Sequence, residues 1–414
     1  MFIINYFEKK VYITIGEVIM KEKKDFPMLN NNIVYFDNAA TSLKPKCVIN
    51  KIQEYYEKYG ANSHRGDYDI SFKVDDEIDS TRILVKNFIN ANKKEEIIFT
   101  RNTTESLNMI VFGFFEHYLN EGDEVIISNS EHASNALPWM VLSRKKNIIV
   151  KIIETKNGIL DISELEKNIS KKTKVISLAQ ITNVYGDIRD ISKISRIAHS
   201  KNILLVVDAA QSAPHMKIDV NELDADFLAF SAHKMCGPMG VGVLYGKYEL
   251  LSKMMPVYFG GGMNKDFNSE VLKLSKIPER FESGTQNISG IIAFSEAIKY
   301  LNSYGMQNIE RHVKFLRKYL IKELKKIPYI KIYNEKCEGS TVIINMKDIL
   351  SGDLGLYLNS KGICVRSGKH CAKMENNKED TVRISLYFYN TYEEIDYLIN
   401  VLKDKKSIIE FANH

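Results

Sequence analysis

Hydrophobic residues over most of the chain fall in short unbroken runs, separated by longer stretches with helical periodicity. Such runs are typical of strands that are buried on both faces of a parallel sheet. They occur at 33–36, 96–99, 124–128, 149–153, 174–180, 203–210, 226–234 and 241–246. Helical periodicity occurs near 45–60, 103–118, 134–145, 161–169 and 190–201. This alternation predicts an α/β domain with a mostly parallel sheet, whose ligands bind at the carboxyl ends of the strands.

The pattern changes from about residue 305, and a long amphipathic helix is expected at about 307–326. The elements expected after it are strands at 330–334 and 340–346, a helix at 352–361, short strands at 364–366 and 382–386, and a final helix. Thr391 and Glu394 open that last helix at the spacing of a capping box. We therefore expect a large domain over 35–304 and a smaller α+β domain over 305–414, with residues 20–34 packing against the smaller domain.

Composition favours a soluble protein that acts in a reducing compartment. Hydrophobic residues make up 44% of the 414 residues and charged residues 26%, and no apolar run approaches the ~20 residues of a membrane span. The net charge of +5 comes from interspersed charges and does not favour nucleic acid. Lys9 and Lys10 interrupt the only apolar start that could resemble a signal peptide. Five scattered cysteines without a CxxC pair argue against disulfides and zinc, so we expect a cytoplasmic protein without a metal.

Two neighbouring strands of the predicted sheet end in side chains that could carry chemistry. Asp208 ends one run, and the next ends in Ser231, His233 and Lys234. An acid and a lysine at one sheet edge could form an ordinary ion pair. However, an apolar setting lowers the pKa of a lysine and makes its amine available for Schiff-base formation. Pyridoxal phosphate needs this pairing, a lysine for its aldehyde and a carboxylate for its pyridine nitrogen.

The stretch RSGKHC at 366–371 places a thiol close to several basic residues. Arg366, Lys369 and His370 precede Cys371, and nearby cations lower the pKa of a thiol and favour the reactive thiolate. Gly368 allows a tight turn. The residues alone leave open whether Cys371 is a nucleophile or a buried structural thiol, while a metal site is disfavoured because no second ligand pair lies nearby.

The motifs together resemble the pyridoxal-phosphate enzymes of fold type I and, within their class V aminotransferase family, the short-loop, SUF-type (group II) cysteine desulfurases. The resemblance runs from about Met20 to about residue 405. It rests on YFDNAAT (35–41), HRG (64–66), TRNTTESLN (100–108), EHASNALPW (131–139), TNVYG (182–186), DAAQS (208–212), SAHK (231–234), GGGM (260–263), RFESGTQN (280–287), RSGKHC (366–371) and RISLYFYNT (383–391). It implies a mostly parallel seven-stranded sheet in the large domain and a nucleophile loop in the smaller one.

The resemblance also implies which residues bind the cofactor. Lys234 would form the Schiff base, Asp208 would pair with the pyridine nitrogen, Gln211 would hydrogen-bond the ring oxygen, and His132 would stack on the ring. The phosphate would lie at the start of a helix, where backbone N–H groups bind anions. The phosphate cup would comprise Thr103, Thr104, Ser231 and His233, completed by Thr285 from the other subunit of a homodimer.

Substrate residues follow from the same resemblance. Arg383 would grip the substrate carboxylate through two parallel hydrogen bonds, with help from Asn183, and Arg366 would serve the substrate or the geometry of the loop. Cys371 would attack the substrate sulfur and keep it as a persulfide. His64 and Arg65 would lie near the entrance of the site.

The implied function is a cysteine desulfurase that turns L-cysteine into L-alanine and supplies sulfur for iron–sulfur cluster assembly. The expected partner is a dedicated sulfur acceptor of the SufE or SufU kind. A selenocysteine lyase or a cysteine-sulfinate desulfinase would share the same cofactor site. An aminotransferase or epimerase of the same fold would not need Cys371, and a non-catalytic scaffold would need neither Lys234 nor Asp208.

Some positions depart from the family pattern. Lys369 replaces a common histidine, Ala232 replaces a common glycine, and the segment 372–382 is shorter and more polar than usual. These changes concern the thiol's surroundings and acceptor docking rather than the Schiff base. Residues 1–19 lie outside the resemblance, and a purine-rich run that can encode the residues just before Met20 makes Met20 an alternative start.

Overall fold

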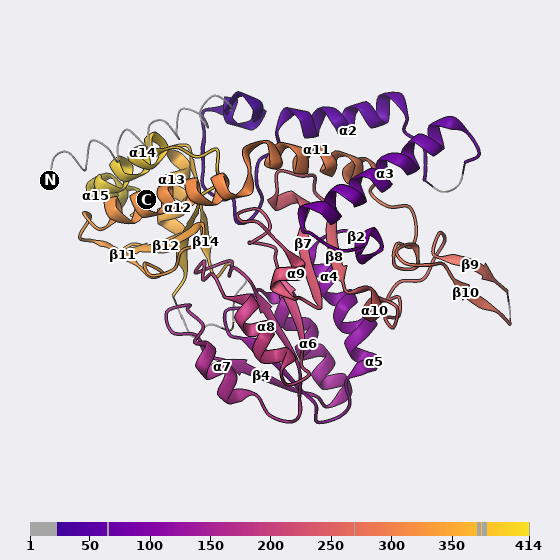
Figure 1. Ribbon diagram of the computed structural model, residues 1–414. Helices are drawn as coiled ribbons and strands as arrows, with labels where there is room; N and C mark the ends of the chain where they lie inside the picture. The colour runs from indigo at the N-terminus through magenta and orange to yellow at the C-terminus, as the bar shows by residue number, and fades with distance from the viewer. Residues whose placement is uncertain (1–22, 64–65, 269, 371–373, 375–378, 414) are drawn as a thin grey trace.

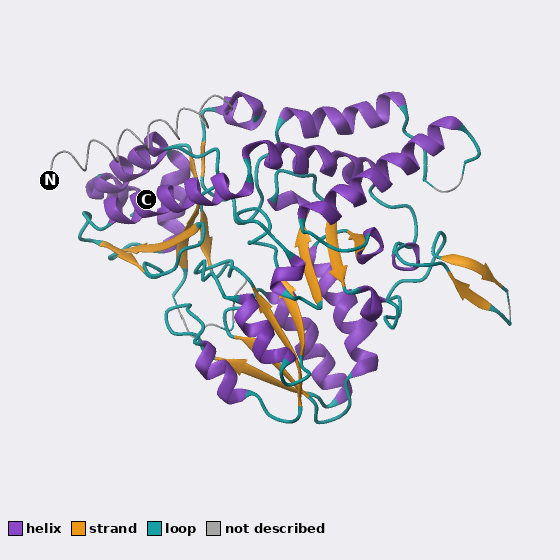
Figure 2. Cartoon of the chain, viewed as in Figure 1, coloured by secondary structure: helices purple, strands orange, loops and turns teal. Residues whose placement is uncertain are grey.

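A seven-stranded sheet forms the centre of the protein in a computed structural model, which describes residues 23–63, 66–268, 270–370, 374 and 379–413 (Figures 1 and 2). Its strands are β2 (Ile97–Thr100), β3 (Glu124–Ser128), β4 (Ile149–Ile153), β5 (Thr173–Ala179), β6 (Leu204–Asp208), β7 (Phe227–Ser231) and β8 (Gly242–Gly246). They lie in the order β2-β8-β7-β6-β5-β3-β4, and β8 is antiparallel to both of its neighbours. The predicted strands and the mostly parallel sheet are confirmed, with strand ends shifted by a few residues.

Helices cover both faces of this sheet, because successive strand residues point to opposite faces. Val207 packs into a core shared with α2, α3, α8 and α11, whereas Val206 packs into a core shared with α4 and α6. The helices of this part are α2 (Lys46–Lys58), α3 (Asp69–Phe88), α4 (Thr103–Met109), α5 (Glu116–Tyr118), α6 (Ala133–Lys146), α7 (Ile162–Asn168), α8 (Ile191–His199), α9 (Val220–Leu223), α10 (Tyr248–Leu251) and α11 (Ile288–Tyr304).

Two long helices, α3 and α11, were not expected from the sequence. Most of α11 is buried on all sides, so it lacks the polar face that marks an amphipathic helix. In α3, Val74, Ile78 and Val85 are buried on one face, but Ile70 and Phe72 are exposed and blur the helical period. Figure 1 shows α2, α3 and α11 side by side along one face of the sheet.

Edge positions account for further differences from the sequence prediction. Strand β4 forms one edge of the sheet, and its Ile149 and Ile152 are exposed rather than buried. The antiparallel hairpin β9 (Asn264–Phe267) and β10 (Leu272–Leu274) was not predicted, and it projects away from the rest of the fold (Figure 1). Among the described residues, no helix is both long and apolar enough to cross a membrane.

A second, antiparallel sheet is built by the C-terminal part of the chain. Its order is β11-β12-β15-β14, from β11 (Ile330–Ile332), β12 (Thr341–Met346), β14 (Arg366–Gly368) and β15 (Thr381–Ser385). It packs with α12 (Met306–Leu324), α13 (Ser351–Ser360), α14 (Tyr392–Lys403) and α15 (Lys405–Ala412). The predicted capping box of Thr391 and Glu394 is present at the start of α14.

The chain segment before the large sheet associates with this C-terminal part. Strand β1 (Val34–Tyr35) pairs in parallel with β13 (Ile363–Cys364), and Asp37 forms a bridge with Ser385. The strand predicted at 364–366 is therefore divided between β13 and β14. The division of the chain into domains near residue 305 stays a prediction.

The short turns of helix are η1 (Lys23–Asp25), η2 (Pro27–Asn31), η3 (Lys94–Glu96), the π-helical η4 (Ile110–Phe115), η5 (Ala232–Lys234) and η6 (Glu279–Phe281).

Candidate active site

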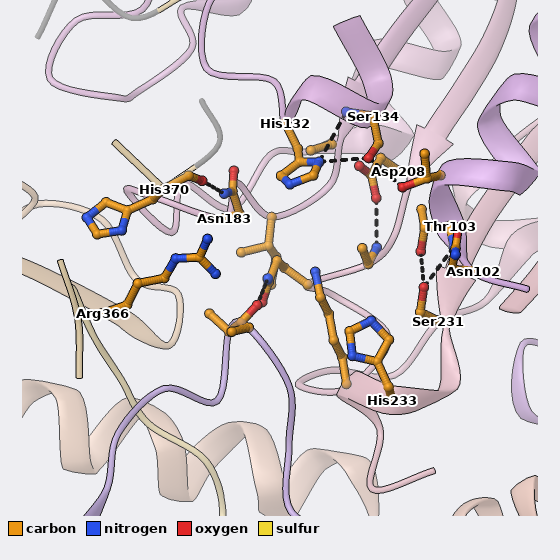
Figure 3. A pocket seen from close by; sticks show the side chains of 18 of the residues that line it. Asn102, Thr103, His132, Ser134, Asn183, Asp208, Ser231, His233, Arg366 and His370 are labelled. Carbon is orange, nitrogen blue, oxygen red and sulfur yellow. Dashed lines mark hydrogen bonds between the residues drawn. The ribbon is translucent and has the colours of Figure 1, made fainter. Parts of the chain in front are cut away.

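A cavity of about 260 Å³ lies at the carboxyl ends of β5, β6 and β7, between the large sheet and strands β14 and β15 of the small one. The predicted site residues that line it are Thr103, Thr104, His132, Asn183, Asp208, Gln211, Ser231, His233, Lys234, Arg366 and Arg383. Figure 3 shows Arg366 and His370 on one side of it and Thr103 and Ser231 on the other. Residues separated by most of the chain therefore meet in one place.

One predicted residue, Thr285, does not line this cavity, and three others lie outside the described residues. Thr285 is exposed and accepts a hydrogen bond of 3.4 Å from Asn62 Nδ2. It does not line the cavity, so it contributes nothing to the site of its own chain. Cys371, His64 and Arg65 lie outside the described residues.

Hydroxyl groups and helix N–H groups gather at one end of the cavity. The Oγ of Ser231 accepts a hydrogen bond of 2.7 Å from the Thr103 N–H and lies 2.6 Å from Thr103 Oγ1. Thr104 Oγ1 lies 2.7 Å from Ser134 Oγ. Asn102 caps the helix by accepting from the Glu105 N–H. This group of donors at a helix start has the composition of a phosphate site.

Asp208 lies at the end of β6 in the floor of the cavity. Its Oδ1 accepts a hydrogen bond of 2.9 Å from the Ala210 N–H. Burial raises the pKa of the carboxyl to about 6, although the Ala210 N–H and Lys234 act in the opposite direction. A buried carboxylate of this kind gains most from a cationic partner, and a protonated pyridine nitrogen would supply one.

Asp208→Asn is expected to stabilise the cofactor-free protein above about pH 6. The folded-state pKa of about 6 exceeds the ordinary value of 3.8, so below 3.8 the carboxyl is protonated in both folded and unfolded states. Between about pH 3.8 and pH 6 the unfolded state loses this proton before the folded state does, so the cost of burial develops over this interval and is fully present above pH 6. Thermal unfolding between about pH 4 and pH 8 should show the variant gaining over wild type with rising pH. Asp266→Asn, at an exposed position on β9, is the control, and equal stabilities of variant and wild type at the upper pH would contradict the assignment.

His132 is held as a neutral imidazole at the start of α6. Its Nδ1 accepts a hydrogen bond of 3.1 Å from the Ser134 N–H and lies 2.9 Å from Ser134 Oγ, which leaves the ring proton on Nε2. Burial, and then the charges of Lys234, Arg383 and Arg366, lower its pKa to about 4. A neutral ring is suited to stacking. Sequence reasoning missed Ser134, although its place two residues into a helix start is a sign of such a contact.

Two arginines face the end of the cavity opposite to the hydroxyl groups. Arg366 and Arg383 lie directly opposite each other on β14 and β15, an arrangement of like charges that is unfavourable unless an anion lies between them. Arg383 is buried and donates to the Asn183 carbonyl at 2.9 Å and to Asp37 Oδ1 at 3.2 Å. The fixed guanidinium suits a carboxylate. Asp37 was not predicted, although it belongs to the YFDNAAT motif.

Asn183 connects this end of the cavity to the segment before Cys371. Its Nδ2 donates to the His370 carbonyl at 2.7 Å, as Figure 3 shows. Its buried Oδ1 has no hydrogen-bond partner among the described residues. This oxygen can accept a hydrogen bond from a donor group of a bound ligand. Asn183 is therefore placed to contact both a ligand and the segment that ends at His370.

His370, a potential cation next to Cys371, is held as a neutral imidazole. The residue has a φ of 50°, is buried, and its Nε2 lies 2.9 Å from Thr381 Oγ1. Burial, followed by the charges of Arg383 and Arg366, lowers its pKa to about 3, so the ring is neutral. Among the basic residues that precede Cys371, His370 therefore contributes no positive charge. Gly368 ends β14 with a φ of 113°, a backbone conformation that favours glycine.

Lys44, which was not predicted from the sequence, supports the turn that carries Lys234. Its Nζ donates to the carbonyl of His233 at 3.0 Å and to Thr41 Oγ1 at 2.9 Å. The same carbonyl accepts from the Ser42 N–H at 3.0 Å. Burial lowers the pKa of Lys44 to about 8. The residue directly before Lys234 is thus fixed by several donors.

The lining fits pyridoxal phosphate from end to end. Hydroxyl and N–H donors match a phosphate, the buried carboxyl of Asp208 matches the pyridine nitrogen, and the amine of Lys234 lies in the same cavity. Gln211 is held by a hydrogen bond of 2.8 Å from its Nε2 to the Ala39 carbonyl. The paired arginines leave room for an anionic substrate at the other end.

Comparison with known proteins agrees with this interpretation. Residues 34–398 match the family model described as aminotransferase class-V. A relative from Borreliella burgdorferi, described as a probable cysteine desulfurase, is 44% identical over 399 residues, covering 92% of this chain and 94% of the relative. Another such relative, from Halalkalibacterium halodurans, is 39% identical over 401 residues, covering 95% and 98%.

Solved structures give the same result. The apo cysteine desulfurase from Thermococcus onnurineus has a TM-score of 0.89 and 39% identity, covering 93% of this chain and 97% of that one. The cysteine desulfurase CsdA from Escherichia coli has a TM-score of 0.89 and 31% identity, covering 95% and 99%.

The chain therefore belongs to the aminotransferase class-V family of fold type I pyridoxal-phosphate enzymes. Within that class it belongs with the cysteine desulfurases. The predicted family, fold and cofactor are confirmed, whereas the short-loop, SUF subtype stays a prediction.

Proposed function

We propose that the protein converts L-cysteine to L-alanine and keeps the sulfur as a persulfide on Cys371, for delivery to iron–sulfur cluster assembly. The observation that carries this proposal is the single cavity that combines Lys234, Asp208 and the arginine pair. This cavity ends at His370, the residue before Cys371. The amine, the acid and the carboxylate-binding arginines are what an amino-acid enzyme of this class needs.

In this reaction, residues of the chain would bind the substrate, transfer its Cα proton and take its sulfur. Arg383 holds the substrate carboxylate, with Arg366 opposite to it, while Lys234 Nζ takes and returns the proton at the substrate Cα. Bound pyridoxal phosphate supplies the electron sink that makes this proton removable. The thiolate of Cys371 then attacks the substrate sulfur, and the Cβ–S bond breaks. Its electron pair stays on Cβ, which takes a proton to become the methyl group of alanine, and the enzyme keeps the sulfur.

The cofactor residues would act as orienting groups in this scheme. Ser231, His233, Thr103 and Thr104 bind the phosphate, and Gln211 donates to the ring oxygen. His132 stacks on the ring face and keeps its proton on Nε2, because Ser134 donates to its Nδ1. Asn183 assists at the substrate end through its buried Oδ1.

The proposed assembly is a homodimer in the cytoplasm that passes sulfur to an acceptor protein of the SufE or SufU kind. Thr285 is exposed and lies outside the cavity of its own chain, which supports a role at the phosphate of the partner subunit. Several apolar side chains between residues 255 and 272, in the part of the chain that precedes Thr285, are exposed, as a subunit interface requires. They are Met255, Tyr258, Phe259, Phe267 and Leu272.

Arg383→Lys is expected to raise KM for L-cysteine by about 10- to 150-fold, because hydrogen bonds to a charged group contribute about 1.5–3 kcal/mol. Lysine keeps the charge but cannot make two parallel hydrogen bonds to a carboxylate. Steady-state kinetics would measure the effect, with Arg311→Lys on the exposed face of α12 as the control. An unchanged KM would remove Arg383 from the substrate site.

The function itself is tested by the products formed from three substrates in the presence of a thiol reductant. We expect equal amounts of alanine and sulfide from L-cysteine, with a higher kcat/KM than for selenocysteine or cysteine sulfinate. A clear preference for selenocysteine or cysteine sulfinate would instead assign the protein to a lyase or a desulfinase with the same cofactor site.

A further inference from the structure

We propose that the buried ion pair of Glu131 and Arg189 is a positioning device that fixes His132 and Asp208, the two sides of the cofactor site, relative to each other. Neither residue lines the cavity, and neither was singled out from the sequence. The inference rests on the proposed cofactor site, but it concerns how the chain builds that site rather than which substrate it uses.

The carboxylate of Glu131 is fully buried and accepts four hydrogen bonds. Its Oε1 accepts from Arg189 Nη1 and from Ser128 Oγ, the latter at 2.7 Å. Its Oε2 accepts from Asn135 Nδ2 at 2.7 Å and from the Ala179 N–H at 2.8 Å. One side chain thus joins the end of β3, the first turn of α6 and the end of β5.

The guanidinium of Arg189 completes the same network from the loop that follows β5. Its Nη2 donates to Ser128 Oγ at 2.8 Å and to Ser130 Oγ at 2.7 Å. Its Nη1 also donates to the Ala179 carbonyl at 3.2 Å, and its Nε donates to Asp187 Oδ2 at 3.3 Å. Every nitrogen of the guanidinium is used, so the loop, β3 and β5 cannot shift independently.

This network lies directly beneath the residues that face the cofactor. Glu131 is the residue before His132, and its partner Asn135 accepts from Ser177 Oγ of β5 at 2.6 Å. Ala179, which is held through both its N–H and its carbonyl, lines the cavity and is paired in register with Asp208 of β6. The Gln180 N–H donates to the Asp208 carbonyl at 3.0 Å. A displacement at Glu131 or Arg189 is therefore passed to both His132 and Asp208.

The charges of the pair also act on Asp208, and they act in opposite directions. Glu131 raises the pKa of Asp208, whereas Arg189 and Lys234 lower it. His132 and His215, on which the charge of Lys234 also acts, are neutral, because burial lowers their pKa values to about 4 and about 3. Removing one member of the pair should therefore shift the titration of Asp208, and removing both should restore it.

The test uses Glu131→Gln, Arg189→Met, the double variant and Arg189→Lys. Two measurements need no substrate: the affinity of the cofactor-free protein for pyridoxal phosphate, and the pH dependence of the visible absorbance of the cofactor-bound protein. Asp226→Asn is the matched control, because it removes a buried partner of Lys247 at the amino end of β7, outside the cavity. It should lower thermal stability without changing either measurement.

We expect both charge-removing single variants to bind the cofactor about 10- to 100-fold more weakly, the range known for outer partners of metal ligands. The absorbance midpoint should move to higher pH in Arg189→Met, to lower pH in Glu131→Gln, and back towards wild type in the double variant. Arg189→Lys keeps the charge but loses the fork, so it should lose affinity without a shift of the midpoint.

Wild-type affinity in both charge-removing variants would overturn the proposal, and so would midpoints that move in the same direction. An equal loss of affinity in Asp226→Asn would also overturn it, because the effect would then be one of general stability. If the variants show these changes, and wild-type protein binds the cofactor but does not turn over L-cysteine, the proposed function fails while this inference stands.

Discussion

Lys234→Ala is expected to lose at least about 10²–10⁴-fold in turnover of L-cysteine, the range typical of a positioned acid–base group. Lys234 is the only lysine that lines the cavity in the described part of the chain. In the proposed mechanism it serves both the covalent attachment of the cofactor and proton transfer at the substrate Cα. The measurement is the rate of alanine formation, together with the loss of the visible absorbance that the Schiff base gives the wild-type protein.

Lys51→Ala is the control for this prediction. Lys51 is a partly buried lysine of α2 that pairs with Glu77 and does not line the cavity, so its removal should leave turnover and absorbance unchanged. A Lys234→Ala variant that kept both its visible absorbance and its rate would show that another amine holds the cofactor.

Cys371→Ala is expected to lose more than about 10³-fold in alanine formation, since removal of a nucleophile eliminates most of the rate enhancement. The variant should keep wild-type affinity for pyridoxal phosphate and the same visible absorbance, because Cys371 is not among the residues proposed to bind the cofactor. Steady-state rates and a cofactor titration measure the two effects separately.

Cys364→Ala is the matched control for the thiol. Cys364 lies half-buried in β13, and burial raises its pKa, so it is a poor nucleophile and its loss should not affect the rate. Turnover that persists in Cys371→Ala would favour the aminotransferase or epimerase alternative, in which no thiol takes part.

Much of the cofactor end of the site could be predicted because it depends on local sequence. Asp208 and Ser231 end unbroken apolar runs, and neighbouring parallel strands bring their carboxyl ends to one edge. Thr103 begins a helix directly after a strand. In these cases the position along the chain determines the position in space, and no distant contact has to be known.

The substrate end could not be predicted in the same way, because it depends on pairings across the whole chain. The contact of Asp37 with Arg383 joins residues 346 positions apart. The opposition of Arg366 and Arg383 depends on the register of β14 and β15. The neutral state of His370 depends on burial by distant elements, so the sequence could show it only as a potential cation. The Glu131–Arg189 pair was missed for a similar reason, because the residue types alone do not show whether an ion pair is buried or exposed.

Whether Cys371 takes the substrate sulfur is tested directly by the mass of the peptide that contains it, after one turnover with L-cysteine without reductant. The proposed function predicts a gain of one sulfur atom on Cys371 and the release of one alanine per active site, both absent in Cys371→Ala. Alanine formed without added sulfur on this peptide, or sulfur found on another cysteine, would contradict it.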